Sequence, residues 1–368
     1  VPHLRFPEFS GEWKKVRLGD NCNIQMCKRI MAAQTNTDRG VPFFKIGTIG
    51  GKADAYISKE LFDEYKAKYP FPHKGEVMIT CAGTVGKCII YNGKDSYYQD
   101  SNIVWIDNPN EIISNDFLYH LLCKVNWSHL NSTTIVRIYN DDLRNLKLYI
   151  PQHDEQKKIT HLLSLINERI ATQNKIIEDL KLLKSAISLN VLHSDTWEQF
   201  KIKDIAQIGR GRVISSIEIS QQKSPTYPVY SSQTSNDGIM GYLDDYMFEG
   251  EYISWTTDGA NAGTVFYRNG KFNCTNVCGL LKLIKGFDTH FVSLVLAEAT
   301  KEYVSINLAN PKLMNNTMGN IQIRLPKLEE QKRISIVFRV LQRLWTIHNS
   351  LLTEYIKQKQ YLLSQMFI

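Results

Sequence analysis

The chain contains few residue patterns that could carry out catalysis. Residues Gly83 to Cys88 include two glycines and a lysine, as a phosphate-binding loop does. That loop needs four residues between its glycines, and a Ser or Thr after the lysine whose hydroxyl binds magnesium. Here two residues separate the glycines, and Cys88 takes the hydroxyl position. The spacing therefore favours a glycine-containing turn between two strands over a phosphate site.

Two further patterns also fall short of a catalytic or metal site. An amino-methyltransferase holds its base with Asn or Asp followed by two prolines and an aromatic residue; Asn108-Pro109-Asn110 and Asn310-Pro311-Lys312 both lack the second proline. Cys274 and Cys278 would make half of a zinc site, but no second Cys or His pair lies at the spacing of a zinc finger. Buried thiols explain this pair better. The sequence predicts neither a catalytic residue nor a metal.

Basic and polar residues suited to nucleic-acid contacts lie in a few expected loops. Phosphate contact requires Lys or Arg, and base recognition uses Arg, Lys, Asn, Gln, Ser or Thr. Two alternatives stay open: a solvated basic loop for the arginines and lysines, and a turn cluster for residues 231–236. The candidates are Lys28, Arg29, Lys45, Thr84, Arg210, Arg212, Ser231, Gln233, Thr234 and Asn236.

Two long expected helices organise the segments that carry these loops. From Gln152 to Leu192 the chain has neither proline nor glycine, and acidic residues stand early, where a helix N-terminus favours negative charge. A helix of this length would extend about 60 Å at about 1.5 Å per residue. Apolar residues recur in steps of three and four, which predicts a coiled-coil seam. The seam consists of Ile159, Leu163, Ile166, Ile170, Ile177, Leu180, Ile187 and Val191.

The same helix pattern returns from Pro326 to Phe367, at a constant offset of 175 residues from Pro151. Its seam is predicted to contain Ile334, Phe338, Leu341, Trp345, Leu352, Tyr355, Leu362 and Met366. Polar residues interrupt both seams at matching places. We expect them to set helix register and partner choice; alternatively, the apolar stripe only rotates off the seam there. These residues are Gln173, Lys184, His348 and Lys359.

The globular segments before the helices repeat as well. Gly75-Glu76 returns as Gly250-Glu251 at the same offset, and Tyr91-Asn92-Gly93 is expected to correspond to the segment from Tyr267 to Gly270. In the first copy we expect a strand over 41–49, two strands around a turn over 76–91, and a helix over 115–130. The frame is repeated whereas the loops differ. Because loops carry binding function on a rigid scaffold, the two copies are expected to bind different versions of one kind of ligand.

These patterns predict an α+β fold of two β-rich domains and a long antiparallel two-helix coiled coil, related by a pseudo-two-fold repeat. The predicted domains are residues 1–150 and 194–325, and the predicted helices cover 151–193 and 326–368. An antiparallel pairing would hold the two domains at opposite ends of the helix pair, tens of ångströms apart. Such a spacing would match about one to two turns of DNA, at about 34–36 Å per turn.

Composition sets wide limits on function. The 368 residues are 43% hydrophobic and 22% charged, as in soluble globular proteins, and no apolar run is long enough for a membrane span. The first residues lack the apolar segment of a signal peptide. Seven cysteines, an odd number, favour a reducing cytoplasm. The net charge of +7 permits an anionic partner such as nucleic acid without requiring one.

Taken together, these residues resemble the specificity subunit of type I restriction-modification systems. The resemblance covers the whole chain. It rests on Leu4 to Phe9 (LRFPEF), the strand from Trp13 to Asp20, the segment from Tyr230 to Ile253, and Asp258 to Gly263 (DGANAG). It also rests on the two Pro-x-x-x-Glu-Gln-Lys helix openings and on the order of domain, helix, domain, helix.

The resemblance implies that each domain recognises one half of a bipartite, asymmetric sequence in double-stranded DNA, with the helices measuring the gap. It implies two adenine-N6 methyltransferase subunits docked on the helices, and restriction–translocase subunits that cut unmodified DNA. S-adenosylmethionine, ATP and magnesium would bind those partners, and the chain itself would be non-catalytic, without cofactor, in a bacterial or archaeal cytoplasm. The alternatives are a stand-alone coiled-coil adaptor without DNA recognition and, disfavoured by the missing motifs, a fused methyltransferase or nuclease.

Overall fold

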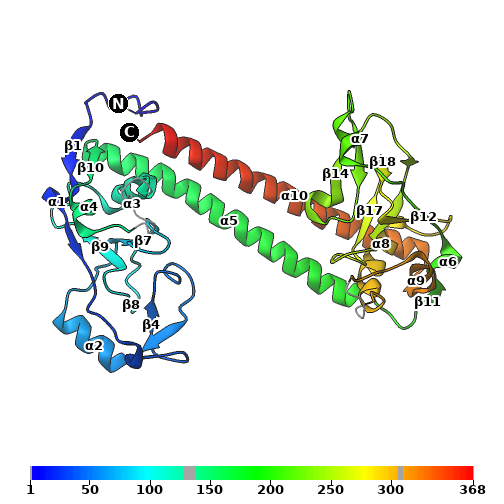
Figure 1. The fold of residues 1–368 in the computed structure, drawn as a ribbon, viewed down its shortest axis with the longest axis horizontal. Helices are drawn as coiled ribbons and strands as arrows, with labels where there is room; N and C mark the ends of the chain where they lie inside the picture. Colours follow the sequence, from blue (N-terminus) through cyan, green and yellow to red (C-terminus); the bar gives the residue numbers. More distant parts are fainter. Residues whose placement is uncertain (1, 128–136, 306–309, 368) are drawn as a thin grey trace. The chain divides into compact units, whose positions relative to one another are not determined.

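The computed structural model describes residues 2–127, 137–305 and 310–367. They form two compact units (Figure 1): unit 1 comprises Val1–Asn174 with Leu351–Ile368, and unit 2 comprises Lys175–Ser350. Each unit therefore contains one β-rich domain and a part of both long helices.

The described part of unit 1 contains three sheets, with strand orders β2-β9-β6-β7, β3-β5-β4-β8 and β1-β10. All strand pairs are antiparallel except β4 and β8, which are parallel. The strands are β1 (Lys14–Arg17), β2 (Asn23–Gln25), β3 (Thr35–Asn36), β4 (Val41–Phe44), β5 (Ala55–Ile57), β6 (Val77–Thr80), β7 (Cys88–Ile90), β8 (Tyr97–Tyr98), β9 (Ile103–Asp107) and β10 (Lys147–Ile150). The helices are α1 (Leu18–Asn21), η1 (Ala32–Gln34), α2 (Lys59–Lys68), α3 (Asn115–Lys124) and α4 (Asn140–Arg144).

The described residues of unit 2 repeat this topology except at one edge strand, with orders β12-β19-β16-β17, β14-β13-β18-β15 and β11-β20. In the second sheet, β3 pairs with β5 in unit 1, whereas β15 pairs with β18 at the opposite edge in unit 2. The strands are β11 (Glu198–Lys201), β12 (Ala206–Arg210), β13 (Tyr227–Tyr230), β14 (Ile239–Leu243), β15 (Phe248–Glu249), β16 (Tyr252–Thr256), β17 (Val265–Arg268), β18 (Lys271–Cys274), β19 (Cys278–Leu283) and β20 (Gln322–Leu325). The helices are α6 (Ile202–Ile205), α7 (Ser216–Ser220), η3 (Ser235–Gly238), α8 (Thr289–Ala299), η4 (Thr300–Glu302) and α9 (Asn315–Asn320). The predicted internal repeat and α+β class are confirmed.

Strand β6 shows why a continuous apolar run forms a central strand. Its residues are all buried, and successive side chains point to opposite faces. Val77 and Ile79 enter the core that also holds α3, whereas Met78 enters a second core with Phe43 and Tyr97. A strand between two cores needs apolar residues on both faces, which explains the absence of polar alternation.

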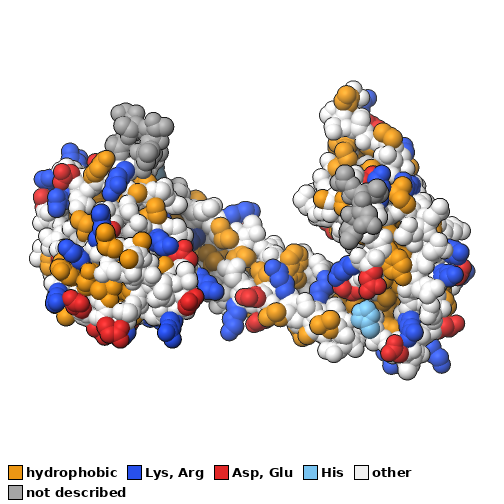
Figure 2. All heavy atoms as spheres, turned by 60° about the horizontal axis from the view of Figure 1, so that its bottom comes forward, with side chains coloured by type: hydrophobic (Ala, Val, Ile, Leu, Met, Phe, Trp, Pro, Cys, Tyr) orange, Lys and Arg blue, Asp and Glu red, His pale blue; other side chains and the backbone are white. Residues whose placement is uncertain are grey.

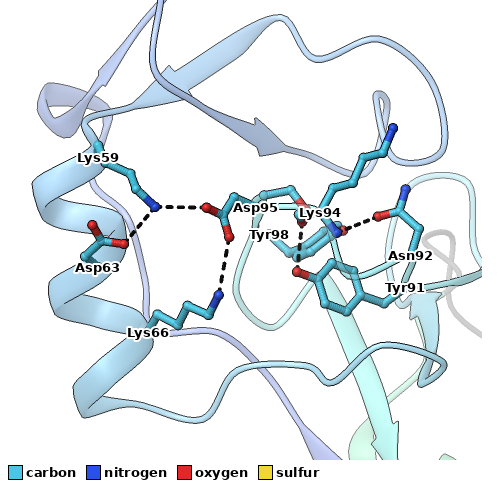
Figure 3. A network of polar contacts seen from close by, with 9 residues as sticks. Lys59, Asp63, Lys66, Tyr91, Asn92, Lys94, Asp95 and Tyr98 are labelled. Atoms are coloured by element: carbon cyan, nitrogen blue, oxygen red, sulfur yellow. Dashed lines mark hydrogen bonds and ion pairs between the residues drawn. The ribbon is translucent and has the colours of Figure 1, made fainter.

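Helix α2 has no counterpart among the described residues of unit 2, and an ion-pair network stabilises its exposed face (Figure 3). Lys59 and Lys66 both pair with Asp95, at 2.9 and 3.3 Å, and Lys59 also pairs with Asp63. The hydrogen bond from Lys59 is the main reason that the pKa of Asp95 is lowered. Ser58 caps the helix by accepting a hydrogen bond from the Leu61 amide.

The long helices are α5 (His153–Val191) and α10 (Leu328–Gln365). In unit 1, Ile159 and Leu163 near the start of α5 share a core with Met366 at the end of the α10 segment. In unit 2, Ile187 near the end of α5 packs on the core that holds Ile334 from the start of α10. The two helices therefore run in opposite directions, as predicted, and every predicted seam residue is buried or half-buried.

Several expected boundaries were wrong. The strand expected over 41–49 ends at Phe44, because the amides of Thr48 and Ile49 turn back to the Lys45 carbonyl. The helix expected over 115–130 ends at Lys124, and residues 128–130 lie outside the described ranges. The expected match of Tyr91 with Tyr267 is shifted by one residue, because strand register aligns Tyr91 with Arg268. None of the described helices combines the length and apolar character that a membrane span needs.

Candidate nucleic-acid interface

Strand register gathers several loops of unit 2 at one edge of its main sheet. Arg210 at the end of β12 pairs with Gly279, and Thr256 at the end of β16 pairs with Cys278. The loops that follow β12 and β16 and the loop that precedes β19 therefore lie together. The loop after β13 joins them, because β13 runs parallel to β18 and Tyr230 pairs with Cys274. We call loops 211–215, 231–238, 257–264 and 275–277 the unit 2 loop edge.

Backbone hydrogen bonds tie the unit 2 loop edge together. The Arg212 amide donates to the Cys274 carbonyl at 3.1 Å, and the Thr275 amide donates to the Tyr230 carbonyl at 2.9 Å. Gly211 is required for this approach, because a Cβ there would lie 1.7 Å from the Cys274 carbonyl oxygen. The Thr257 amide donates to the Val277 carbonyl at 3.1 Å. The loops thus form one connected surface.

The same register places loops 26–31, 45–51, 81–87 and 99–102 at one edge of the main sheet of unit 1, which we call the unit 1 loop edge. The Gln99 amide donates to the Phe44 carbonyl at 2.9 Å, as Thr275 does to Tyr230 in the other unit. The Cys81 amide donates to the Asn102 carbonyl at 2.7 Å. Lys87 donates to the Ile49 carbonyl and so joins two of these loops.

All of the nucleic-acid candidates predicted from the sequence lie on the two loop edges or at the strand ends beside them. Gln25 pairs with Trp105 and Gly209 pairs with Leu280, so Lys28 and Arg212, each three residues further on, occupy matching positions. Lys45 and Ser231 match as well, each directly after the strand that pairs with β8 or β18. Their contact with DNA stays a prediction, as does that of Arg29, Thr84, Arg210, Gln233, Thr234 and Asn236.

The basic candidates have partners within the protein. Arg29 pairs with Asp100 at 2.6 Å and Lys45 with Asp54 at 3.0 Å. Arg210 donates to the Asn315 side chain at 2.9 Å. All three basic side chains are largely exposed or half-exposed, and exposed ion pairs contribute only about 0–1 kcal/mol, so a phosphate can replace the internal partner.

Arg212 makes the strongest of these internal pairs. Both of its terminal nitrogens donate to the Glu218 carboxylate. The hydrogen bond from Arg212 lowers the pKa of Glu218, and the pKa of Arg212 is raised in turn. Lys and Arg side chains are interspersed with Asp and Glu on the face drawn in Figure 2. Phosphate contact on that face would therefore involve individual basic residues rather than one continuous basic patch.

The loop from Ser231 to Gly238 is a closed turn with exposed polar side chains. The Ser231 amide donates to the Gly238 carbonyl at 2.9 Å, and the Gln233 side chain donates to the Ile239 carbonyl. Thr234 and Asn236 are exposed. Asn236 and Asp237 have positive φ angles of 49° and 53°, a left-handed conformation that Asn and Asp adopt more readily than most residues. The turn interpretation is confirmed, and it leaves side chains free to contact a ligand.

The sequence did not identify the basic residues that fasten these loops. Arg268 at the end of β17 is buried, yet it reaches Asp237 in the 231–238 loop. Tyr267 pairs with Ile253 as Ile90 pairs with Val77, and Val77 and Ile253 both face the core that holds the short helix of their unit. Arg268 is therefore equivalent to Tyr91, the residue after Ile90. The expected match of Tyr91 with Tyr267 hid this equivalence. One sequence feature could have indicated the buried role of Arg268: this charged residue directly precedes the Asn269-Gly270 turn, at the end of a strand expected to be buried.

The residues expected to set helix register differ in exposure. Gln173, His348 and Lys359 are half-buried, whereas Lys184 is exposed. Burial lowers the pKa of His120 on α3 to about 4, and the charge of Lys359 lowers it further. In unit 2, burial and then Arg339 lower the pKa of His290 to about 4, with a smaller contribution from Lys184. The role of Gln173, Lys184, His348 and Lys359 in helix register is still a prediction.

The helices also present apolar side chains to solvent. Within unit 2, a cavity of about 290 Å³ lies between them, lined by Leu180, Lys184, Leu341 and Trp345 among others. Hydrophobic side chains are visible on the helix surface in Figure 2. Those on α10 in unit 2 recur at helical spacing, which is unusual for a surface that stays exposed to water. They are Ile336, Val337, Val340, Leu344 and Ile347.

The described residues contain no group of three or more His, Cys, Asp or Glu that could hold a metal ion. Cys274 and Cys278 are buried, as predicted, with the Cys274 Sγ 3.5 Å from the Cys278 carbonyl oxygen. The segment from Gly83 to Cys88 is a turn between β6 and β7, as predicted; Gly86 has a φ of 81°, and a Cβ there would lie 2.2 Å from the Trp127 ring.

The family model for the type I restriction modification DNA specificity domain matches residues 10–182 and 194–358, one match for each copy of the repeat. This chain belongs to that family. Membership confirms the resemblance stated above and, at family level, a role in DNA recognition rather than catalysis.

Individual proteins that this chain resembles are type I specificity subunits as well. A putative type I restriction enzyme specificity subunit of Haemophilus influenzae is 46% identical over 169 residues, which are 46% of this chain and 43% of that protein. A putative type I specificity subunit of Mycoplasma pneumoniae is 34% identical over 224 residues, 59% of this chain and 83% of that protein. The crystal structure of the type I S subunit from M. genitalium superposes with a TM-score of 0.74 at 16% identity, covering 100% of this chain and 99% of that one. The last match supports the fold.

Proposed function

We propose that this chain is the DNA sequence-recognition subunit of a type I restriction-modification complex and recognises a bipartite, asymmetric sequence in double-stranded DNA. The observation that carries the proposal is the pair of loop edges on one repeated frame. Lys28 and Lys45 in unit 1 correspond to Arg212 and Ser231 in unit 2. Different side chains at matching positions would contact different base edges, because each base pair presents its own pattern of donors and acceptors in the major groove.

The two long helices would set the gap between the half-sites. Helix α5 has 39 residues, a length of about 58 Å at 1.5 Å per residue. One turn of DNA is about 34–36 Å, so a spacer of this length fits half-sites separated by about one to two turns. The antiparallel direction of the helices favours domains that meet DNA in opposite orientations.

The exposed apolar residues of the helices support docking of two adenine-N6 methyltransferase subunits, joined by restriction–translocase subunits. These partners would bind S-adenosylmethionine, ATP and magnesium, and the chain would bind no cofactor of its own. The complex would work in the cytoplasm of a bacterium or archaeon. A stand-alone coiled-coil adaptor is the alternative, since exposed apolar helix residues alone would suit it. The polar side chains on both loop edges favour DNA recognition over that alternative.

An electrophoretic mobility shift tests the proposal with the full chain bound to its methyltransferase subunit. Genomic fragments are titrated at 50 to 200 mM salt, and each bound fragment is compared with a version in which one half-site is scrambled. We expect a shift that weakens steeply with salt and weakens further, by at least about 10³-fold, when either half-site is scrambled. Equal binding to intact and scrambled fragments, or no shift with any fragment, would rule out DNA recognition and leave the adaptor.

A further inference from the structure

Arg268 is a buried cation beneath the unit 2 loop edge. Its side chain is 1% exposed. The guanidinium carbon lies 3.6 Å from the centre of the Tyr230 ring and 4.4 Å from the centre of the Phe266 ring. The guanidinium thus lies over two aromatic rings, an environment that suits the planar, delocalised charge of Arg better than the ammonium group of Lys. Burying a charge is costly unless it is paired, so the partners of Arg268 must account for its position.

Two side chains accept hydrogen bonds from Arg268. Nε donates to Ser254 Oγ at 3.0 Å within the sheet, and Nη1 donates to Asp237 Oδ2 at 3.0 Å. The Asp237 side chain is 69% exposed and belongs to the 231–238 loop. Arg268 therefore connects a rigid strand below to an exposed loop above. Through this ion pair, Arg268, which is too buried to contact a ligand, holds Asp237, which a ligand can contact.

The ion pair acts on the strained part of the loop. Asn236 and Asp237 both have left-handed backbone conformations, which persist only where surrounding contacts stabilise them. The loop also lies against the guanidinium at Gly238, where a Cβ would be 3.1 Å from Nη2 of Arg268. Without Arg268, the closing hydrogen bonds of Ser231 and Gln233 would be the main restraints left on these residues.

The described part of unit 1 has no buried cation at the equivalent position. The residue equivalent to Arg268 is Tyr91, whose ring packs against Tyr98 at a centroid distance of 6.0 Å. The equivalent of Tyr230 is Phe44, which stacks on Tyr98 at a centroid distance of 5.7 Å. An apolar stack thus supports the loop after β4, whereas a cation supports the loop after β13. The frame alone does not require a charge at this place, so Arg268 is specific to the shape of the 231–238 loop.

We propose that Arg268 is a positioning residue that fixes the conformation of the 231–238 loop. By doing so, it determines which bases this loop selects in one half of the target. The inference rests on the proposed function, since it assumes that this loop contacts DNA. Arg268 itself does not touch DNA. It acts through Asp237, which keeps Ser231, Thr234 and Asn236 in one arrangement.

The test uses the full chain with its methyltransferase subunit and a pool of duplexes in which both half-sites are randomised. Bound duplexes are sequenced for the wild type and for Asp237→Asn, Arg268→Met and Arg268→Lys. Asp195→Asn is the matched control, because exposed Asp195 forms a 2.9 Å ion pair with Arg324 in the same unit but away from the loop edge. Thermal unfolding of each variant is recorded alongside.

We expect Asp237→Asn and Arg268→Met to lower base discrimination about tenfold at one or more positions of a single half-site, the size of one misplaced side chain–base contact. The other half-site and the control stay unchanged, and Arg268→Lys gives partial rescue because it restores the charge without the stacked plane. If Arg268→Met does not fold, Asp237→Asn decides, because its site is exposed.

Two contrary results are distinguishable. If the wild type selects both half-sites and Asp237→Asn selects the same bases equally well, Arg268 is not a positioning residue and the proposed function stands. A fall in affinity for all sequences alike, without loss of discrimination, also overturns the inference, because it indicates a purely structural role. If the wild type selects no sequence, the proposed function itself is wrong.

Discussion

Gln156 and Gln331 share two equivalent hydrogen bonds in the two copies of the repeat. Gln156 Nε2 donates to the Pro151 carbonyl at 3.1 Å, and Gln331 Nε2 donates to the Pro326 carbonyl at 2.8 Å. The side-chain oxygens accept from the amides of Ser114 and Asp288, at 2.8 and 3.0 Å. Ser114 and Asp288 are the N-caps of α3 and α8. Each glutamine therefore joins a long helix to the short helix of a domain, which explains why Gln recurs in both helix openings.

Replacing Gln331 with Ala should destabilise unit 2. Gln331 is 1% exposed, so the substitution leaves the Asp288 amide and the Pro326 carbonyl without this partner in a buried site. We expect a loss of about 3 kcal/mol, measured by chemical denaturation. Gln358→Ala, at an exposed position of α10, is the control and should stay within about 0.5 kcal/mol. A loss below 1 kcal/mol for Gln331→Ala would show that the hydrogen bonds of Gln331 do not stabilise the fold.

The glutamates that precede these glutamines differ, and this gives a second prediction. Glu155 is fully buried and accepts two hydrogen bonds of 2.7 Å from Arg5, whereas Glu330 is exposed. Glu155→Gln leaves Arg5 without its counter-charge, so it should cost about 3 kcal/mol and lower the thermal midpoint by about 6–12 °C. Glu330→Gln is the same substitution at the matching position and should shift the midpoint by less than about 2 °C. Equal shifts of the thermal midpoint for the two variants would show that Glu155 and Glu330 do not differ in their contribution to stability.

Some features of this fold follow from the sequence, whereas others depend on contacts that form only on folding. The seam residues were predictable, because Ile159 and Ile334 recur at one offset and burial follows helical periodicity. The positions of the candidate loops were predictable as well, because Lys28 and Arg212 each follow a strand that ends at the loop edge of its own unit. Their contact with DNA stays a prediction. The position of Arg268 was not predictable, because a charge on a strand is expected to face solvent. Its burial depends on Tyr230, Phe266 and Asp237, which the chain brings together only on folding.

A third prediction concerns phosphate contact. Replacing Arg212 with Gln should weaken DNA binding by the complex about equally for all sequences, and should reduce the slope of log affinity against log salt by about 0.9. Glu218→Gln should do the reverse and tighten non-specific binding, because it frees the Arg212 guanidinium. Arg324→Gln, away from the loop edge, is the control. An unchanged salt slope for Arg212→Gln would exclude this residue from phosphate contact.

A fourth prediction concerns pH. The folded-state pKa of His120 is about 4, below its ordinary value of 6.5, mainly through burial and also through Lys359. Between these pH values the unfolded chain binds more protons, so stability is complete above about pH 6.5 and is lost as the pH falls toward 4. The steepest loss is about 1.4 kcal/mol per pH unit for this histidine. His120→Gln should flatten that dependence in denaturation experiments between pH 7 and 4.5; a slope equal to the wild type would contradict it.

The central claim is that two related domains on one chain recognise the two halves of a divided DNA sequence. Replacing residues 194–325 with the corresponding segment of another family member, and mapping modified adenines by single-molecule sequencing in cells, tests it most directly. Cells without the chain should lack one split motif; cells with the exchanged segment should keep one half of that motif and change the other. Modification that is identical with and without the chain, or an exchange that alters both halves, would contradict the account.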